Sequence, residues 1–275
     1  MLKKRIITAL CGLPPVIAAV WFDKPLPWFT ILLAILGLLA VLEFYKMSNI
    51  SKIPSLTCFG LIWTLLFILS PHFKHDFLIP LLLTSLVMLS LICLLLLPQK
   101  EKAFTGWVWT MAGILYVGWL LSYFVALRDL DAGRNWVFFA LLTTFGSDSA
   151  AFFYGSALGR HRLAPYISPR KTWEGAIAGV FGAIIVCFLF TLPTLFTIPN
   201  PLYLQGFSYW QAILLGLLVS IFGQLGDLVK SLLKRNMGVK DSGKLMPGHG
   251  GILDRLDSVV FAGVVVYYYV IWAIS

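Results

Sequence analysis

Runs of about twenty apolar residues recur from one end of this 275-residue sequence to the other, and they limit the possible folds more than any other feature. An α-helix needs about 20 such residues to cross a bilayer. Strands of a membrane barrel are about half as long and alternate apolar with polar residues, a pattern these runs lack. The sequence therefore predicts an all-α, polytopic integral membrane protein with about nine transmembrane helices. The predicted spans are residues 6–22, 27–45, 55–71, 77–97, 104–127, 136–158, 173–195, 207–229 and 252–274.

The composition agrees with a membrane protein. Hydrophobic residues make up 59% of the chain and charged residues 12%, about half the charged fraction of a soluble domain. The first span follows three basic residues, as in a secretory signal, but Pro14 and Pro15 interrupt it and no small-residue cleavage site follows, so we expect it to be retained. The four cysteines lie inside apolar spans without metal-type spacing, which indicates small buried side chains.

Lysines and arginines are distributed unequally between the two sets of alternating loops. Seventeen lie in one set and four in the other, at Lys24, Lys74, Arg128 and Arg134. Cytoplasmic loops are enriched in these residues, so the split predicts a cytoplasmic N-terminus and, after nine crossings, an external C-terminus. The net charge of +9 is thus first a topology signal. Nucleic acid is not expected as a partner, because the charges lie on short loops between spans.

Ionisable residues divide the chain into two predicted regions. Residues 1–130 carry few of them within their spans and are predicted to be a transmembrane scaffold; Glu43 is the exception, and we expect an interfacial carboxylate near Lys46. Residues 131–275 are predicted to be the catalytic region with a cytoplasmic loop. Their spans contain Asp148, Asp227, Asp254 and Asp257, and an unpaired charge at membrane depth is costly, so these carboxylates are functional candidates.

Several polar side chains share a helix face as the eighth span runs into the predicted cytoplasmic loop. A residue advances about 100° along an α-helix, which places Gln224, Asp227, Ser231, Lys234 and Arg235 on one side. After the loop, Asp254 and Asp257 are three residues apart and share a face. Three carboxylates suit Mg²⁺, which is usually held by one or two carboxylates and substrate phosphates. The alternative is that these carboxylates are neutralised by neighbouring lysines and arginines.

The intervening loop is rich in glycine, with four glycines among residues 243–251. Glycine lets backbone N–H groups approach a ligand closely. The loop leads directly into a helix, whose N-terminus is an anion site. Together with the lysines before it and the carboxylates after it, this loop predicts a pocket for phosphate and metal.

These residues resemble the signature of the phosphatidate cytidylyltransferase (CDP-diacylglycerol synthase) family. The resemblance covers 27 consecutive positions, with Met246 as a departure where another aliphatic is usual. Two upstream segments, residues 146–152 and 163–175, are similar to other shared segments of that family. The three stretches read SLLKRNMGVKDSGKLMPGHGGILDRLD (231–257), GSDSAAF (146–152) and LAPYISPRKTWEG (163–175).

The resemblance implies transfer of a cytidylyl group from CTP to phosphatidic acid, giving CDP-diacylglycerol and pyrophosphate for phospholipid synthesis. It implies that Asp227 and Asp254 hold Mg²⁺, with a second cation possible, and that Ser231, Lys234 and Arg235 contact phosphates. The other catalytic candidates are Lys240, Asp241, His249, Arg255 and Asp257, and the substrate-binding candidates are Asp148, Ser168, Lys171, Gly250 and Gly251. The protein is expected in the inner (plasma) membrane, surrounded by membrane lipids, with its site facing the cytoplasm. Whether it forms a homodimer is left open.

Both substrates are polyanions, so cationic side chains and a divalent cation are needed to offset their repulsion. The nucleophile is a phosphate oxygen that is already ionised, so no general base is required. His249 is equally consistent with a phosphate donor and a structural turn residue. Two alternatives stay open: a related transferase for another lipid phosphate or nucleotide, and a membrane carrier for an anionic substrate.

Overall fold

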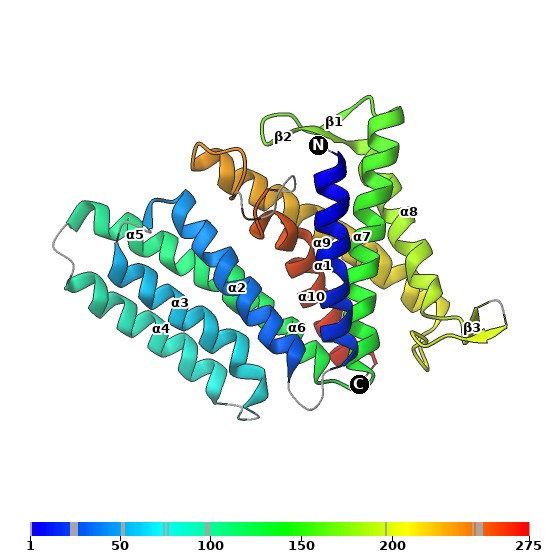
Figure 1. Ribbon diagram of the computed structural model, residues 1–275, viewed down its shortest axis with the longest axis horizontal. Coiled ribbons are helices and arrows are strands. Elements are labelled where there is room, and N and C mark those ends of the chain that lie inside the picture. Colours follow the sequence, from blue (N-terminus) through cyan, green and yellow to red (C-terminus); the bar gives the residue numbers. More distant parts are fainter. Residues whose placement is uncertain are drawn as a thin grey trace. The chain divides into compact units, whose positions relative to one another are not determined.

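The computed structural model describes residues 2–22, 27–50, 53–73, 75, 77–96, 100–195, 197–243, 245 and 250–274, and only the backbone of residues 2–11 and 100–102. The chain forms two compact units (Figure 1). The first unit comprises residues 1–126 and 236–255, and the second comprises residues 127–235 and 256–275. The loop after the eighth span therefore packs with the N-terminal helices. The functional division into scaffold and catalytic regions stays a prediction.

The first unit is a bundle of helices. It contains α1 (Leu2–Trp21), α2 (Trp28–Met47), α3 (Pro54–Leu69) with a 3-10 turn (Ser70–His72), α4 (Leu78–Leu95), α5 (Lys100–Gly113), a π-helical turn (Ile114–Trp119) and most of α6 (Leu120–Arg128). Figure 1 shows α2, α3 and α4 side by side, and contacts join α3 to all of its neighbours in this bundle. Aromatic and aliphatic side chains fill its core: Trp63, Phe67, Leu82, Leu86 and Ile114.

Tyr45 illustrates how closely the helices of the first unit approach. Its ring is fully buried, and its hydroxyl donates to the carbonyl of Thr110 at 3.0 Å. A Cβ atom at Gly60 of α3 would overlap this ring. A small residue is therefore needed where α3 faces α2, since lipid supplies no hydrophobic drive and membrane helices associate through close packing.

The second unit contains α7 (Gly133–Leu158), α8 (Trp173–Leu189), α9 (Tyr209–Asn236) and α10 (Leu253–Ala273), apart from the first residues of α10. Helices α7 and α8 pack closely: a Cβ at Gly175 would lie 2.8 Å from the carbonyl oxygen of Ala151 and 3.1 Å from the Cα of Gly155. An aromatic cluster packs at the other end of the unit, formed by Trp136, Phe139, Phe190 and Phe207. The packing of small residues fixes the position of the segment between α7 and α8.

That segment is a small antiparallel hairpin, which the sequence did not predict. Strand β1 (Arg162–Ala164) pairs with β2 (Ser168–Thr172), with Arg162 opposite Thr172. The side chain of Thr172 accepts a hydrogen bond from the backbone N–H of Gly175 and so caps α8. A second, shorter hairpin joins β3 (Thr194–Leu195) to β4 (Ile198–Pro199). The all-α class is confirmed, because these strands are short connections between long helices.

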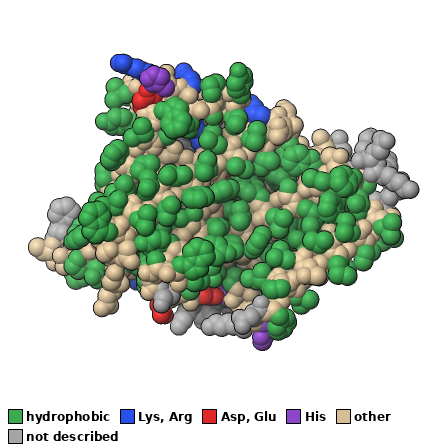
Figure 2. Space-filling model, turned by 180° about the vertical axis from the view of Figure 1, so that it is seen from behind, with side chains coloured by type: hydrophobic (Ala, Val, Ile, Leu, Met, Phe, Trp, Pro, Cys, Tyr) green, Lys and Arg blue, Asp and Glu red, His purple; other side chains and the backbone are tan. Residues whose placement is uncertain are grey.

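Seven helical segments among the described residues are long and apolar enough to span a membrane. They are α2, α3 with its 3-10 turn, α4, the continuous helix Ala103–Arg128, α7, α9 and α10. The apolar stretches Gly12–Trp21 in α1 and Trp173–Leu189 in α8 are shorter. Each of the nine predicted spans thus falls on a helix, and the number nine is approximate. Apolar side chains dominate the surface in Figure 2, as expected of helices that face lipid.

The charge distribution predicts which loops face the cytoplasm, and this topology can be tested at exposed residues. Pro199 precedes α9 and Asn236 is its last residue, and both are exposed. Single cysteines at these two positions, in a background without the four native cysteines, should react with an impermeant maleimide from opposite sides of a sealed membrane. Labelling from the same side would contradict the predicted orientation of α9.

Candidate active site

A cavity of about 510 Å³ opens in the second unit beside the β1–β2 hairpin. Its cationic lining comes from Arg162, Arg170 and Lys171, and its acidic lining from Asp148 and Asp227. Apolar side chains such as Phe152 and uncharged polar ones such as Ser168 complete the lining. Three of the predicted substrate-binding residues, Asp148, Ser168 and Lys171, are therefore brought together with the predicted metal ligand Asp227.

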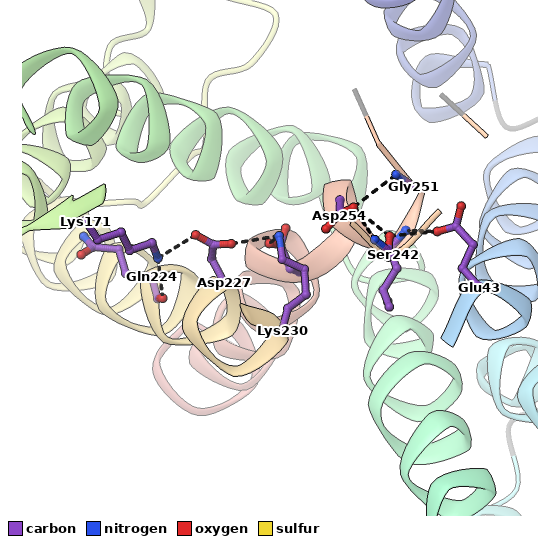
Figure 3. A network of polar contacts seen from close by, with 10 residues as sticks. Glu43, Lys171, Gln224, Asp227, Lys230, Ser242, Gly251 and Asp254 are labelled. Carbon is purple, nitrogen blue, oxygen red and sulfur yellow. Dashed lines mark hydrogen bonds and ion pairs between the residues drawn. The ribbon is translucent and has the colours of Figure 1, made fainter. Parts of the chain in front are cut away.

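Asp227 lies between two lysines (Figure 3). One carboxylate oxygen pairs with the Lys171 Nζ at 2.7 Å, and the other pairs with the Lys230 Nζ at 2.9 Å. The Lys171 ammonium also donates to the Gln224 carbonyl at 3.3 Å. The hairpin is thus joined to α9 by a charged contact, which explains how a carboxylate on an apolar helix is stabilised.

Lys230 extends this charge network to α10. Its ammonium group pairs with Asp257 as well as with Asp227, and both Lys230 and Asp257 are buried, with 6% and 5% of their surfaces exposed. The alternative in which neighbouring lysines neutralise the carboxylates is thus realised for Asp227 and Asp257 through Lys230. The predicted catalytic residue Asp257 contacts a buried lysine, which is consistent with a role in holding α9 to α10.

The remaining signature residues on α9 lie beyond the cavity. Ser231 and Lys234 are partly exposed, Arg235 is exposed, and none of the three lines the cavity. The Arg235 Nε donates to the Ile167 carbonyl at the tip of the hairpin, at a long 3.5 Å. The helix face predicted from the sequence is continuous, but only its Gln224 and Asp227 portion reaches the cavity.

The glycine-rich loop is held together around Asp254 in the first unit. Asp254 Oδ2 accepts hydrogen bonds from the Ser242 N–H at 3.0 Å, the Ser242 hydroxyl at 2.8 Å and the Gly251 N–H at 3.2 Å (Figure 3). Gly250 has a φ of +85°, which favours glycine. The sequence predicted that backbone N–H groups of this loop bind a phosphate. Those of Ser242 and Gly251 instead donate hydrogen bonds to Asp254.

Other predicted residues of this loop are exposed or lie outside the described part of the chain. Lys240, Asp241 and Arg255 are exposed. His249 lies outside the described residues, together with Lys244 and residues 246–248. The exposed residues named here, within the described part of the chain, thus comprise two cationic side chains and one carboxylate.

Glu43 is placed differently from the sequence-based expectation. It was expected to be an interfacial carboxylate near Lys46, but only 2% of its surface is exposed. Its Oε2 accepts hydrogen bonds from the Leu253 N–H and the Ser242 hydroxyl. The expectation was wrong because the groups that donate to Glu43 belong to a loop about two hundred residues further along the chain, which spacing within α2 cannot reveal.

The carboxylates suit a hard cation, although the described residues contain no group of three or more His, Cys, Asp or Glu side chains that could hold a metal. A cluster of three is not required for Mg²⁺, which substrate phosphates help to bind. Asp254 Oδ2 accepts three hydrogen bonds from the loop, which hold this carboxylate in place. Both oxygens of Asp227 contact lysines, so a cation would replace one ammonium group there.

Comparison with known proteins shows the family to which the chain belongs. A profile of the cytidylyltransferase family matches residues 3–273. The chain belongs to this family. It is 34% identical to the phosphatidate cytidylyltransferase of Bacillus subtilis strain 168 over 271 residues, which cover 97% of each protein. It is also 34% identical to the proteins of that name in Staphylococcus haemolyticus and Staphylococcus aureus strain COL, over 94% of this chain and 95% of each relative.

The family membership confirms the resemblance drawn from the 27-position signature and extends it to the N-terminal half. Sequence reasoning missed two parts of the site in this cytidylyltransferase family member. Arg162 and Arg170 line the cavity, and their basic character within residues 159–172 was the available signal. Glu43 was visible as a lone acid in an apolar span, but its partner was not.

Removing the charge of each carboxylate should distinguish a carboxylate that binds a cation from one that serves only in an ion pair. In Asp227→Asn or Asp254→Asn the shape is kept and the charge is lost, so turnover should fall by orders of magnitude and half-maximal activity should require more Mg²⁺. Activity across a Mg²⁺ titration and the Tm in detergent are the measurements.

The matched control is Asp131→Asn, which changes an exposed aspartate outside the cavity. It should behave like the unmodified protein. If Asp227→Asn instead lowers the Tm while the Mg²⁺ dependence of the remaining activity is unchanged, Asp227 serves only to pair with Lys171 and Lys230.

Proposed function

We propose that this protein transfers the cytidylyl group of CTP to phosphatidic acid, releasing pyrophosphate and forming CDP-diacylglycerol for phospholipid synthesis. The observation that carries the proposal is similarity along 97% of the chain to a protein named phosphatidate cytidylyltransferase. The charged cavity of the second unit supports it independently, because both substrates are phosphate-bearing anions.

The cavity has the chemistry needed for the phosphate end of a lipid. Arg162, Arg170 and Lys171 supply three cationic groups, while Phe152 and Leu163 supply apolar surface in the same lining. Arginine suits phosphate because its planar fork donates two parallel hydrogen bonds. An amphipathic molecule with a phosphate head therefore fits this lining better than a soluble sugar or an amino acid does.

The reaction requires alignment and charge neutralisation more than proton transfer. An ionised phosphate oxygen of phosphatidic acid attacks the α-phosphorus of CTP; the new P–O–P bond forms as the bond to the β-phosphate breaks, and pyrophosphate leaves with the electron pair. Cationic side chains stabilise the charge that develops on the leaving group. Lys171 and Arg170 are the proposed partners of one phosphate, and Lys234, Arg235 and Lys240 are the candidates for the others.

Asp227 and Asp254 are the proposed Mg²⁺ ligands. When bound, the cation would supply positive charge to the phosphates. Lys171 and Lys230 hold the Asp227 carboxylate in one orientation, and Ser242 and Gly251 hold Asp254. The setting proposed for this reaction is the cytoplasmic face of the plasma membrane, where the predicted topology puts the basic loops.

A direct assay tests the proposed activity. Detergent-solubilised protein should convert radiolabelled CTP and phosphatidic acid into a cytidine liponucleotide and pyrophosphate, and only with a divalent cation present. Sustained turnover in excess chelator would contradict the cation assignment. No product with any of the four ribonucleoside triphosphates, from protein with a cooperative thermal transition, would favour the anion-carrier alternative.

Arg235 tests whether recognition of phosphate depends on the geometry of the guanidinium group. Arg235→Lys keeps the charge and loses the planar fork, so we expect at least about a tenfold loss in kcat/KM, or roughly 1.4 kcal/mol of transition-state stabilisation. Arg134→Lys is the matched control, since Arg134 lies at the start of α7, on the side of the membrane that the charge distribution predicts to be external. Equal activity of the two variants would exclude Arg235 from phosphate binding.

A further inference from the structure

Glu43 is a buried carboxylate that no step of the proposed reaction uses. It lies in α2 with 2% of its surface exposed, and its Oε2 accepts hydrogen bonds from the Leu253 N–H at 3.0 Å and the Ser242 hydroxyl at 3.2 Å (Figure 3). Its Oε1 has no hydrogen-bond partner among the described residues. Burying a carboxylate with one unsatisfied oxygen costs stability, so its presence requires another explanation.

The glycine-rich loop is shaped to receive this side chain. A Cβ at Gly243 would lie 2.7 Å from the Glu43 Cδ, and one at Gly251 would lie 2.8 Å from the same atom. Both distances are too short for a real side chain. Two of the four glycines that the sequence assigned to close phosphate approach thus leave the space that the Glu43 carboxylate occupies.

Glu43 and Asp254 are connected through one hydroxyl group. The Ser242 oxygen lies 3.2 Å from Glu43 Oε2 and 2.8 Å from Asp254 Oδ2, and it carries a single hydrogen that the two carboxylates share. Glu43 also holds the N–H of Leu253, the residue before Asp254. The contacts of Glu43 therefore fix both the serine that binds Asp254 and the backbone from which Asp254 projects.

We propose that Glu43 is a positioning residue for the reaction: it anchors the glycine-rich loop to α2 and thereby orients Asp254. The catalytic consequence rests on the proposed function, whereas the anchoring itself does not. Partners that orient a metal-binding carboxylate typically change activity or metal affinity by about 10- to 100-fold when removed. The N-terminal half thus contributes directly to the order of the site.

The test compares Glu43→Gln with Thr30→Val. Thr30 is also buried in α2, and its hydroxyl lies 2.8 Å from the His72 Nε2, so its variant breaks a polar contact of the same helix away from the loop. Hydrogen exchange of the peptide covering residues 250–256 is measured in both, together with kcat/KM and the Mg²⁺ concentration for half-maximal activity. Ser242→Ala and the double variant complete a cycle with Glu43→Gln.

We expect Glu43→Gln to speed exchange of residues 250–256, to lower kcat/KM by about 10- to 100-fold and to raise the required Mg²⁺, while its Tm stays at or above that of Thr30→Val. The fold loss in kcat/KM of the double variant should be much smaller than the product of the two single-variant fold losses, because both substitutions act through one contact. Exchange and Mg²⁺ dependence in Glu43→Gln that match Thr30→Val would overturn the proposal. If the unmodified protein forms no liponucleotide, the proposed function fails, and the exchange comparison still decides whether Glu43 anchors the loop.

Discussion

The ion pairs around Asp227 are the interaction on which the second unit depends. A carboxylate on an apolar helix is tolerated only when cationic partners replace the water that it has lost. Lys171 reaches it from the β1–β2 hairpin, and Lys230 reaches it from the next turn of α9 while also pairing with Asp257 of α10. One charge therefore fixes the hairpin, α9 and α10 with respect to each other.

The same contacts shape the cavity in which we propose that substrate phosphates bind. Lys171 is held at the cavity by Asp227, so the hairpin presents Arg162 and Arg170 to the same space. Close packing of α7 against α8 stabilises this arrangement, because the glycines at their contact bring the two ends of the hairpin together. A phosphate that binds Lys171 would compete with Asp227 for the ammonium group, which couples substrate binding to the orientation of that carboxylate.

In the first unit, hydrogen bonds hold the glycine-rich loop. Hydrogen bonds from backbone and hydroxyl donors converge on Asp254, and a buried carboxylate on α2 receives the remaining donors. Within the described part of the loop, these hydrogen bonds hold Ser242, Gly251 and Leu253 in place. The helix bundle supports the loop through Glu43 of α2, and its core cluster packs α3 against α4 and the π-helical turn.

The sequence by itself determined the fold class, the approximate spans and the family. Length and hydropathy suffice for this because the bilayer allows only helices or closed barrels, and the 27-position signature is local in the chain. Asp227 was selected because a charge within an apolar span is costly, and Lys171 because it lies in a segment similar to one shared by the family. Only the tertiary structure decided which groups meet: that Lys171 pairs with Asp227, that a hairpin forms one wall of the cavity, and that Glu43 receives the loop at Ser242. These contacts join residues 56 to 199 positions apart, and helix periodicity carries no information beyond its own helix.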